Sequence, residues 1–203
     1  MSANTKAASN FDVGTIAKIA VLGAIAFLLM MFEIPLPFSV PFYKLGFDEV
    51  AVLLAGFALG PVAGAITELL KILLNVIFQG TQTAYVGEFA NLIMGWAFVL
   101  PASIYYQKHK TREGAFKSLV IGSISLVIVG ALANYFVMIP AFSYFYNLPI
   151  DAIIGMGTGI FSGVKDLFTF ILFMTVPFNL VKGIVVSLVT ALIYKRVSPI
   201  LHK

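Results

Sequence analysis

The feature that most constrains the fold of this chain is a series of apolar segments, several of them long enough to cross a lipid bilayer. The first covers residues 13–32, and about 20 residues suffice to span the hydrocarbon core. It is too long for a typical signal-peptide core, and Glu33-Ile34-Pro35 follows it instead of a small-residue cleavage site. The chain is 60% hydrophobic and 11% charged, whereas a water-facing surface needs more charge. The sequence therefore predicts an all-α integral membrane protein.

We expect a six-helix transmembrane bundle that forms a single transmembrane domain over residues 1–203. Residues 1–12 form a polar cytoplasmic tail. The helix at 48–59 rises about 1.5 Å per residue, so it is too short to cross on its own. The expected helices cover residues 13–32, 48–59, 62–78, 85–107, 116–139 and 178–194.

Two connections are expected on the outer side of the membrane. Residues 34–46 carry three prolines and several aromatic residues, so they form a stiff apolar loop that packs over the protein's own rim or over a bound ligand. Residues 141–175 form a longer connection with one or two short helices, because the apolar run at 164–175 is too short to span. A seventh span in this region is the alternative.

The distribution of Lys and Arg predicts the orientation. Cytoplasmic loops of membrane proteins carry an excess of these residues. With six spans and both termini in the cytoplasm, nine of the 13 basic residues lie on the inner side: Lys6, Lys18, Lys108, Lys110, Arg112, Lys117, Lys195, Arg196 and Lys203. The net charge of +4 therefore reflects membrane topology, and nucleic acid is not an expected partner.

Polar side chains inside or at the edge of the spans are candidates for a site. Lys182 lies three residues after Asn179, so the two share one helix face. A buried charge there indicates a functional site, although a lysine can also extend its ammonium to the lipid headgroups. Glu88 and Asn134 also lie toward the outer face, which indicates an outward-facing pocket with an apolar, aromatic wall.

Glu68, Lys71 and Asn75 lie on one face of the helix at 62–78. We favour a buried ion pair facing the bundle interior over a direct role in ligand binding.

Several classes of function are excluded or disfavoured. The chain has no cysteine, and His109 and His202 lie in polar flanks, so neither a metal site nor a histidine-based catalytic site is expected within the membrane. Ser162 has no histidine in any span to activate it, which argues against an intramembrane protease. No G-x-x-x-x-G-K-[ST] loop occurs, so this chain does not hydrolyse ATP. We expect a protein that is not an enzyme.

Six motifs give the chain a specific resemblance over nearly its whole length. They are Pro41-Phe42-Tyr43-Lys44-Leu45, residues 56–64 (GFALGPVAG), Glu68-Leu69-Leu70-Lys71, Gly87-Glu88-Phe89-Ala90-Asn91, Asn134-Tyr135 and residues 177–183 (PFNLVKG). In these motifs the chain resembles the riboflavin-specific S-components of energy-coupling factor (ECF) vitamin transporters, the RibU family.

The resemblance implies a six-helix bundle in a bacterial cell membrane that binds riboflavin in its outer half and has no resident cofactor. It implies flavin contacts from Glu88, Asn134, Asn179 and Lys182, with Phe38, Phe42 and Leu45 of the first loop closing over the ring. It also implies that Ala20 and Ala24 dock on a transmembrane T-component, which works with two ATPase subunits.

The chemistry of these residues suits a flavin. The pyrimidine edge of the ring alternates carbonyl acceptors with an N–H donor, and a carboxamide offers both. Lys182 can donate to a ring carbonyl, and Glu88 can accept hydrogen bonds from the ribityl hydroxyls. FMN would add a phosphate where basic residues are sparse, so riboflavin is preferred. The alternatives are an S-component for thiamine, biotin or folate, and a stand-alone secondary transporter, which would usually be larger and carry internal repeats.

Overall fold

The structure is a computed structural model that describes residues 12–81 and 83–201. Most of the predicted cytoplasmic tail, residues 1–11, lies outside these ranges, as do His202 and Lys203. The first four helices are α1 (Val13–Met30), α2 (Asp48–Leu59), α3 (Pro61–Gln79) and α4 (Val86–Lys108). Their ends agree with the sequence prediction to within two residues.

The second half of the chain contains two long composite helices. The first joins α5 (Arg112–Ala133), the π-helical segment η1 (Asn134–Met138) and α6 (Ile139–Phe145). The second joins α8 (Leu167–Phe170), the π-helical segment η2 (Ile171–Thr175) and α9 (Val176–Leu201). Between them lies the separate helix α7 (Ile150–Ile160).

Five of these helices are long and apolar enough to cross a membrane: α1, α3, α4, α5–η1–α6 and α8–η2–α9. Their outward faces carry exposed apolar side chains such as Ile124, Ile128 and Leu132 on α5, as expected for contact with lipid. With α2 and α7, the described residues form seven continuous helices, where the sequence predicted six. The seventh is α7, a short helix of the kind expected within residues 141–175, which has 11 residues and is too short to span.

The predicted extent of the 141–175 connection is wrong, because helices α6 and α9 contain Pro140 and Pro177 and the composite helices continue through both prolines. A proline in a helix loses a hydrogen bond and clashes with the carbonyl four residues earlier. In the structure each proline lies two residues after a π-helical segment, so the carbonyls of Phe136 and Phe173 belong to the widened turns. The π-helical turns therefore accommodate the prolines without ending either helix. The connection shortens to residues 146–166.

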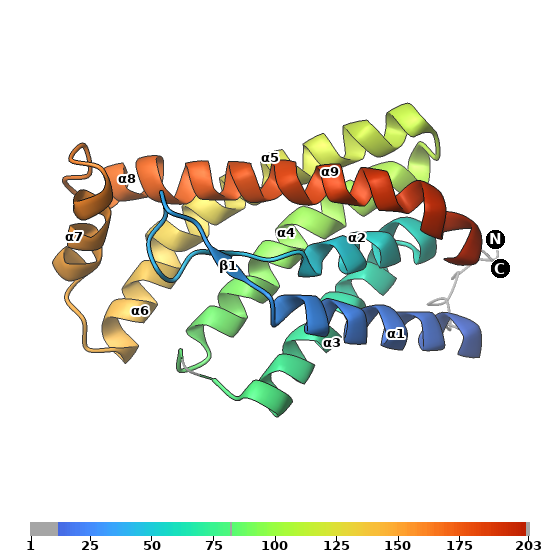
Figure 1. Cartoon of the computed structure of the whole chain (residues 1–203), viewed down its shortest axis with the longest axis horizontal. Helices are drawn as coiled ribbons and strands as arrows, with labels where there is room; N and C mark the ends of the chain where they lie inside the picture. Colours follow the sequence, from blue (N-terminus) through green and yellow to red (C-terminus); the bar gives the residue numbers. More distant parts are fainter. Residues whose placement is uncertain (1–11, 82, 202–203) are drawn as a thin grey trace, which may run out of the picture.

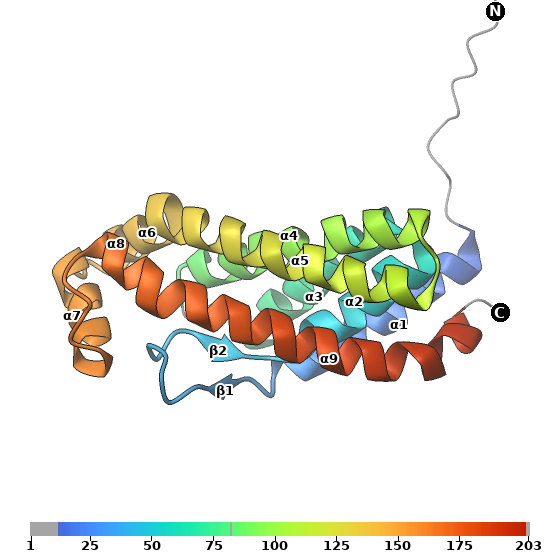
Figure 2. The same ribbon diagram turned by 90° about the horizontal axis from the view of Figure 1, so that it is seen from above.

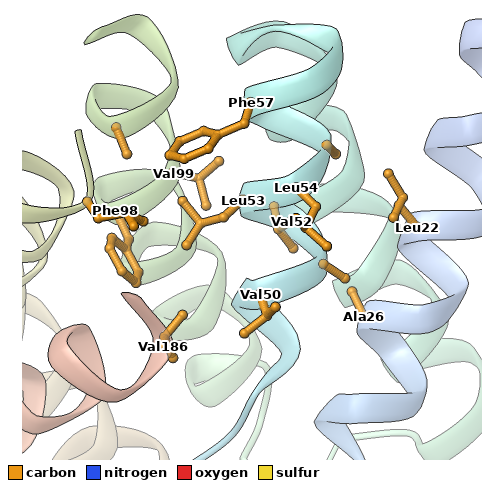
Figure 3. Packing of buried hydrophobic residues seen from close by; sticks show 14 of the residues in the cluster. Leu22, Ala26, Val50, Val52, Leu53, Leu54, Phe57, Phe98, Val99 and Val186 are labelled. Atoms are coloured by element: carbon orange, nitrogen blue, oxygen red, sulfur yellow. The ribbon is translucent and has the colours of Figure 1, made fainter. Parts of the chain in front are cut away.

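Helix α2 lies at the centre of the bundle. Its residues from Asp48 to Phe57 are all buried, and Leu53 and Phe57 pack with Phe98 and Val99 of α4 (Figure 3). Gly60 ends α2 with a φ of 102°, a conformation that favours glycine, and Pro61 begins α3 at its first position. A 12-residue helix thus fills the core instead of crossing as a full span, as its length predicts.

The first loop is more regular than expected. Its two ends, β1 (Ile34–Pro35) and β2 (Lys44–Leu45), pair as short antiparallel strands, with Ile34 opposite Leu45. Figure 2 shows this hairpin projecting at one side of the helical layer. The prediction of an all-α chain is therefore incomplete at this point, because the prolines at 35, 37 and 41 stiffen the loop without preventing edge pairing.

The helix ends divide between two ends of the bundle. The first turn of α1, the α4–α5 turn and the last turns of α9 lie at one end (Figure 1). The β-hairpin, the α3–α4 turn, α6, α7 and α8 lie toward the other end. The segments at the first end carry all seven described basic residues that the sequence assigned to the inner side: Lys18, Lys108, Lys110, Arg112, Lys117, Lys195 and Arg196.

Candidate substrate-binding site

A cavity of about 490 Å³ opens at the end of the bundle that carries the hairpin. This volume is typical of sites for small organic ligands. The wall combines the first loop, the end of α3, the start of α4, η1 and the start of α9, so segments far apart in sequence meet there. Five of the seven predicted substrate-binding residues line it: Phe42, Glu88, Asn134, Asn179 and Lys182.

Aromatic side chains form one side of the cavity. Tyr43 stacks on Phe178 with ring centroids 5.0 Å apart, and Phe42 packs edge-on against Tyr43 at 4.9 Å. Phe142 of α6 adds a third element, with its ring 5.8 Å from that of Phe42. This arrangement holds the first loop against α6 and α9 and creates an apolar surface on which a planar ligand can stack.

Asn134 is held in place by its neighbours. It is the first residue of η1 and is 7% exposed. The Tyr43 hydroxyl donates to its side-chain oxygen at 2.8 Å, and its amide nitrogen donates to the Gly130 carbonyl at 2.8 Å. Tyr43 also shares a 2.8 Å hydrogen bond with Thr175 of η2. Tyr43 thus links the loop to both π-helical segments.

Asn179 lies on α9 opposite Gly130 of α5 and is 4% exposed. A Cβ atom at position 130 would collide with the Asn179 amide nitrogen, so the glycine makes room for this side chain. No hydrogen bond to the Asn179 side chain occurs within residues 12–81 and 83–201. Its amide remains available to a ligand in the cavity.

Glu88 lies in the first turn of α4, at the other side of the cavity. The Thr83 hydroxyl donates to its carboxylate at 2.6 Å and accepts from the Gly87 amide at 3.0 Å. A carboxylate is favoured at a helix N-terminus by the macrodipole. One carboxylate oxygen of Glu88 is fixed by Thr83, which leaves the other free to accept from a hydroxyl group.

Lys182 reaches the cavity wall from α9 and is 5% exposed. Its ammonium lies 3.1 Å from Glu49 Oε1 on α2. The sequence left open whether this lysine extends its ammonium to the lipid headgroups, and in the structure it does not. Lys182 instead points into the bundle.

Behind Lys182 lies a buried charge network. The Lys71 ammonium lies 2.6 Å from Asp48 and 2.8 Å from Glu68, and 3.7 Å from Glu49 Oε1. All four side chains are at most 1% exposed. The predicted ion pair between Glu68 and Lys71 is confirmed. Asp48 and Glu49 were not part of that prediction, because acidic residues are common in the first turn of a helix and do not by themselves indicate burial.

Phe38 and Leu45 do not line the cavity. Phe38 is 45% exposed at the turn of the loop, and Leu45 is a buried residue of β2 that pairs with Ile34. Their assignment to the substrate site stays a prediction. Other lining residues were absent from the predicted set: Glu33, Tyr43, Lys44, Asn75, Gln79 and Asn91. Asn91 shares a helix face with Glu88, which was the signal in the sequence that could have identified it.

Glu33 precedes β1, outside the candidate spans, and borders the cavity. Burial, and then the negative charge of Asp48, raises the pKa of its carboxyl from 4.5 to about 7. Between these values the folded protein keeps a proton that the unfolded chain releases. The stability associated with Glu33 is therefore fully present below about pH 4.5 and is lost as the pH rises through about 7.

Replacing Glu33 should remove this pH dependence. We expect Glu33→Gln to melt at nearly the wild-type temperature at pH 5. At pH 8 it should melt at a higher temperature than the wild type, because its free energy of unfolding is larger by at most about 3 kcal/mol. Thermal unfolding of the purified protein across this pH range measures the difference. Glu113→Gln, at an exposed carboxyl on α5, is the control and should show no such gain at pH 8. A constant offset between Glu33→Gln and wild type would contradict the assignment.

Helix α1 has an outward face of small residues that includes Ala20 and Ala24, the predicted docking residues. Ala17, Ala20 and Ala24 are exposed, whereas Gly23 faces the bundle and packs against Leu70 of α3. A second helix could therefore approach α1 closely along the alanine face.

Comparison with known proteins agrees with this architecture. Residues 14–194 match the family described as "ECF transporter, substrate-specific component". A solved structure described as "Structure and mechanism of the S component of a bacterial ECF transporter" superposes with a TM-score of 0.72 at 34% sequence identity. The match covers 93% of this chain and 98% of the other.

Curated relatives match over a similar extent. The chain is 37% identical over 185 residues to "Riboflavin transporter RibU" of Staphylococcus aureus, covering 91% of this chain and 90% of the relative. It is 30% identical over 188 residues to "Riboflavin transporter FmnP" of Bacillus subtilis, covering 92% and 93%. The relatives are named as transporters and not as enzymes. The chain belongs to the family of substrate-specific components of ECF transporters.

Proposed function

We propose that this protein is the riboflavin-binding membrane subunit of an ECF-type vitamin uptake transporter. The proposal rests on the cavity, in which an aromatic wall meets Asn134, Asn179, Lys182 and Glu88. The naming of the curated relatives as riboflavin transporters supports the choice of substrate.

The cavity can accommodate each part of the vitamin. The flavin ring would stack beside Phe42 and Tyr43, with its pyrimidine edge toward Asn179 and Lys182. The ribityl hydroxyls would reach Glu88, whose carboxylate accepts charge-assisted hydrogen bonds. Asn134 already uses its amide within the protein, so its contribution to binding is to hold Tyr43 and to offer its remaining acceptor and donor capacity.

Riboflavin is the proposed substrate in preference to FMN. The cavity wall holds two lysines, Lys44 and Lys182, and no arginine among the described residues. Lys182 is paired with Glu49, and Glu33 and Glu88 add negative charge. A phosphate would find no cluster of basic residues to bind it.

A panel of vitamins tests the substrate against the alternatives within the family. A ligand present at 100 times its Kd stabilises the folded protein by about 2.7 kcal/mol, which shifts the Tm of a chain of this size by roughly 5 °C or more. We expect riboflavin to produce this shift and thiamine, biotin and folate to leave the Tm unchanged. A shift with one of those three and none with riboflavin would reassign the substrate.

We further propose that the chain crosses a bacterial cell membrane six times with both termini in the cytoplasm. In this arrangement the first loop and the buried helix α2 together return the chain through the interior of the bundle, α3 crosses back, and α7 lies at the outer surface. The grouping of basic residues at the end with the α4–α5 turn supports this orientation by the positive-inside rule. The cavity then opens outward, as capture of an external vitamin requires.

Transport also requires partners, because the sequence contains no phosphate-binding loop for ATP. We propose that the chain works with a transmembrane T-component and two ATPase subunits, which drive release of riboflavin into the cell. The alanine face of α1 is the proposed contact with the T-component.

Bulky residues on this face should separate binding from transport. We expect the double substitution Ala20→Trp and Ala24→Trp to leave the riboflavin Kd unchanged and to abolish co-purification with the T-component and ATP-dependent uptake. Leu192→Trp, at an exposed position on α9, is the matched control and should retain both. Normal uptake by the α1 variant would place the docking surface elsewhere.

A further inference from the structure

The position of the Lys182 ammonium depends on a carboxylate outside the cavity wall. A lysine side chain has several rotatable bonds, and its ammonium is a compact charge that can occupy many positions. In the structure Lys182 Nζ donates a hydrogen bond to Glu49 Oε1 at 3.1 Å, and both side chains are almost fully buried. Within residues 12–81 and 83–201, Glu49 is its hydrogen-bond partner.

Glu49 is itself held from behind. It is the second residue of α2 and is 1% exposed, and it does not line the cavity. Its Oε1 also lies 3.7 Å from the Lys71 ammonium, which is fixed by Asp48 and Glu68. A continuous series of charges therefore runs from α3 through α2 to Lys182 on α9.

The geometry leaves part of Lys182 free for a ligand. An ammonium has three N–H donors. One is directed at Glu49, so the other two can donate to acceptors in the cavity, such as the carbonyl oxygens of a flavin. Without the Glu49 carboxylate, the buried Lys182 ammonium would lose the group that it donates to, and nothing would hold it at its place in the cavity wall.

We propose that Glu49 is a positioning residue for substrate binding, which acts by holding the charged Lys182 side chain at the cavity wall and not by touching the ligand. This inference rests on the proposed riboflavin-binding function. It assigns a role in recognition to the start of α2, the helix that otherwise serves as the core of the bundle.

A double-mutant cycle tests this role. Glu49→Gln preserves the shape of the side chain, and the remaining Asp48 and Glu68 still balance Lys71 and Lys182 in charge, so the variant should fold. We expect Glu49→Gln to weaken riboflavin binding about 10-fold and Lys182→Met to weaken it about 10- to 100-fold. In the Lys182→Met background, the added Glu49→Gln should change the Kd by less than about 3-fold, because the residue acts through Lys182.

The conservative variant and thermal stability provide further readouts. Glu49→Asp keeps the charge and should retain most of the affinity that Glu49→Gln loses. Lys182→Met alone leaves the buried Glu49 carboxylate without its partner. The double variant with Glu49→Gln should therefore have a higher Tm than Lys182→Met. This measurement also shows whether the Lys182→Met protein is folded well enough for its Kd to be compared.

Equal losses of affinity from Glu49→Gln in the wild-type and Lys182→Met backgrounds would overturn the inference, because Glu49 would then act independently of Lys182. An unchanged Kd in Glu49→Gln would also overturn it. Absence of riboflavin binding to the wild-type protein would overturn the proposed function and the inference with it. Binding by the wild type with an unchanged Kd in Glu49→Gln would overturn the role of Glu49 alone.

Discussion

Replacing Lys71 by methionine should abolish the stable fold of this protein. The side chain is fully buried and its ammonium lies between Asp48 and Glu68, at 2.6 Å and 2.8 Å. Methionine fills a similar volume but leaves the carboxylates without this counter-charge inside an apolar bundle. Breaking a buried ion pair from one side costs about 3–5 kcal/mol, a large fraction of the stability of a typical domain.

Thermal unfolding and size-exclusion chromatography in detergent measure this effect. Lys117→Met is the control, since it breaks the 2.6 Å ion pair with Glu113 on the exposed surface of α5 and should leave the Tm unchanged. Neutralising the former partners of Lys71 with Asp48→Asn and Glu68→Gln should recover much of the lost stability. A folded Lys71→Met protein with a wild-type Tm would show that the network does not hold α2 and α3 together.

Replacing Asn179 by leucine should weaken riboflavin binding by about 10- to 100-fold while leaving the fold intact. Leucine has a similar size, so it can occupy the space beside Gly130, but it cannot hydrogen-bond to the pyrimidine edge. A ligand donor or acceptor left unpaired in a buried site costs about 1–3 kcal/mol. Because Asn179 has no hydrogen-bond partner within the described residues, its loss should cost the free protein little.

Flavin fluorescence titration gives the Kd, and the Tm without ligand reports on the fold. Ser187→Ala is the control on the same helix, because Ser187 pairs with Ser123 at 3.2 Å and does not line the cavity. It should bind riboflavin as the wild type does. An Asn179→Leu protein with wild-type affinity would place the pyrimidine edge against other residues, among which Asn75 and Asn91 line the same cavity.

Much of the bundle could be predicted because local signals in the sequence mark its helix boundaries. Gly60-Pro61 separates α2 from α3, and Gly80 ends α3 with a φ of 70°, which favours glycine. The apolar length of each segment then distinguishes spanning helices from the short α2. The same reasoning placed Asn179, Lys182, Glu88 and Asn134 near one another, and the structure brings all four to one cavity.

The remaining features depend on tertiary contacts that a single sequence does not display. Prolines ordinarily mark helix ends. The helices nevertheless continue past Pro140 and Pro177, because the preceding turns in η1 and η2 are widened, and such turns carry no clear sequence signature. Asp48 and Glu49 begin α2 as acidic residues commonly do, and only their packing against Lys71 and Lys182 shows that they are buried. Likewise, Tyr43 joins the site through hydrogen bonds to Asn134 and Thr175, which lie 91 and 132 positions further along the chain.

Titration of riboflavin with the purified wild-type protein, followed by flavin fluorescence, determines whether the cavity binds riboflavin. A flavin stacked beside Phe42 and Tyr43 and hydrogen-bonded to Asn179 and Lys182 should show quenching that saturates at one ligand per protein. Protein purified from cells that contain riboflavin should also be yellow. Absence of quenching by protein that unfolds cooperatively on heating would contradict the assignment of riboflavin to this site.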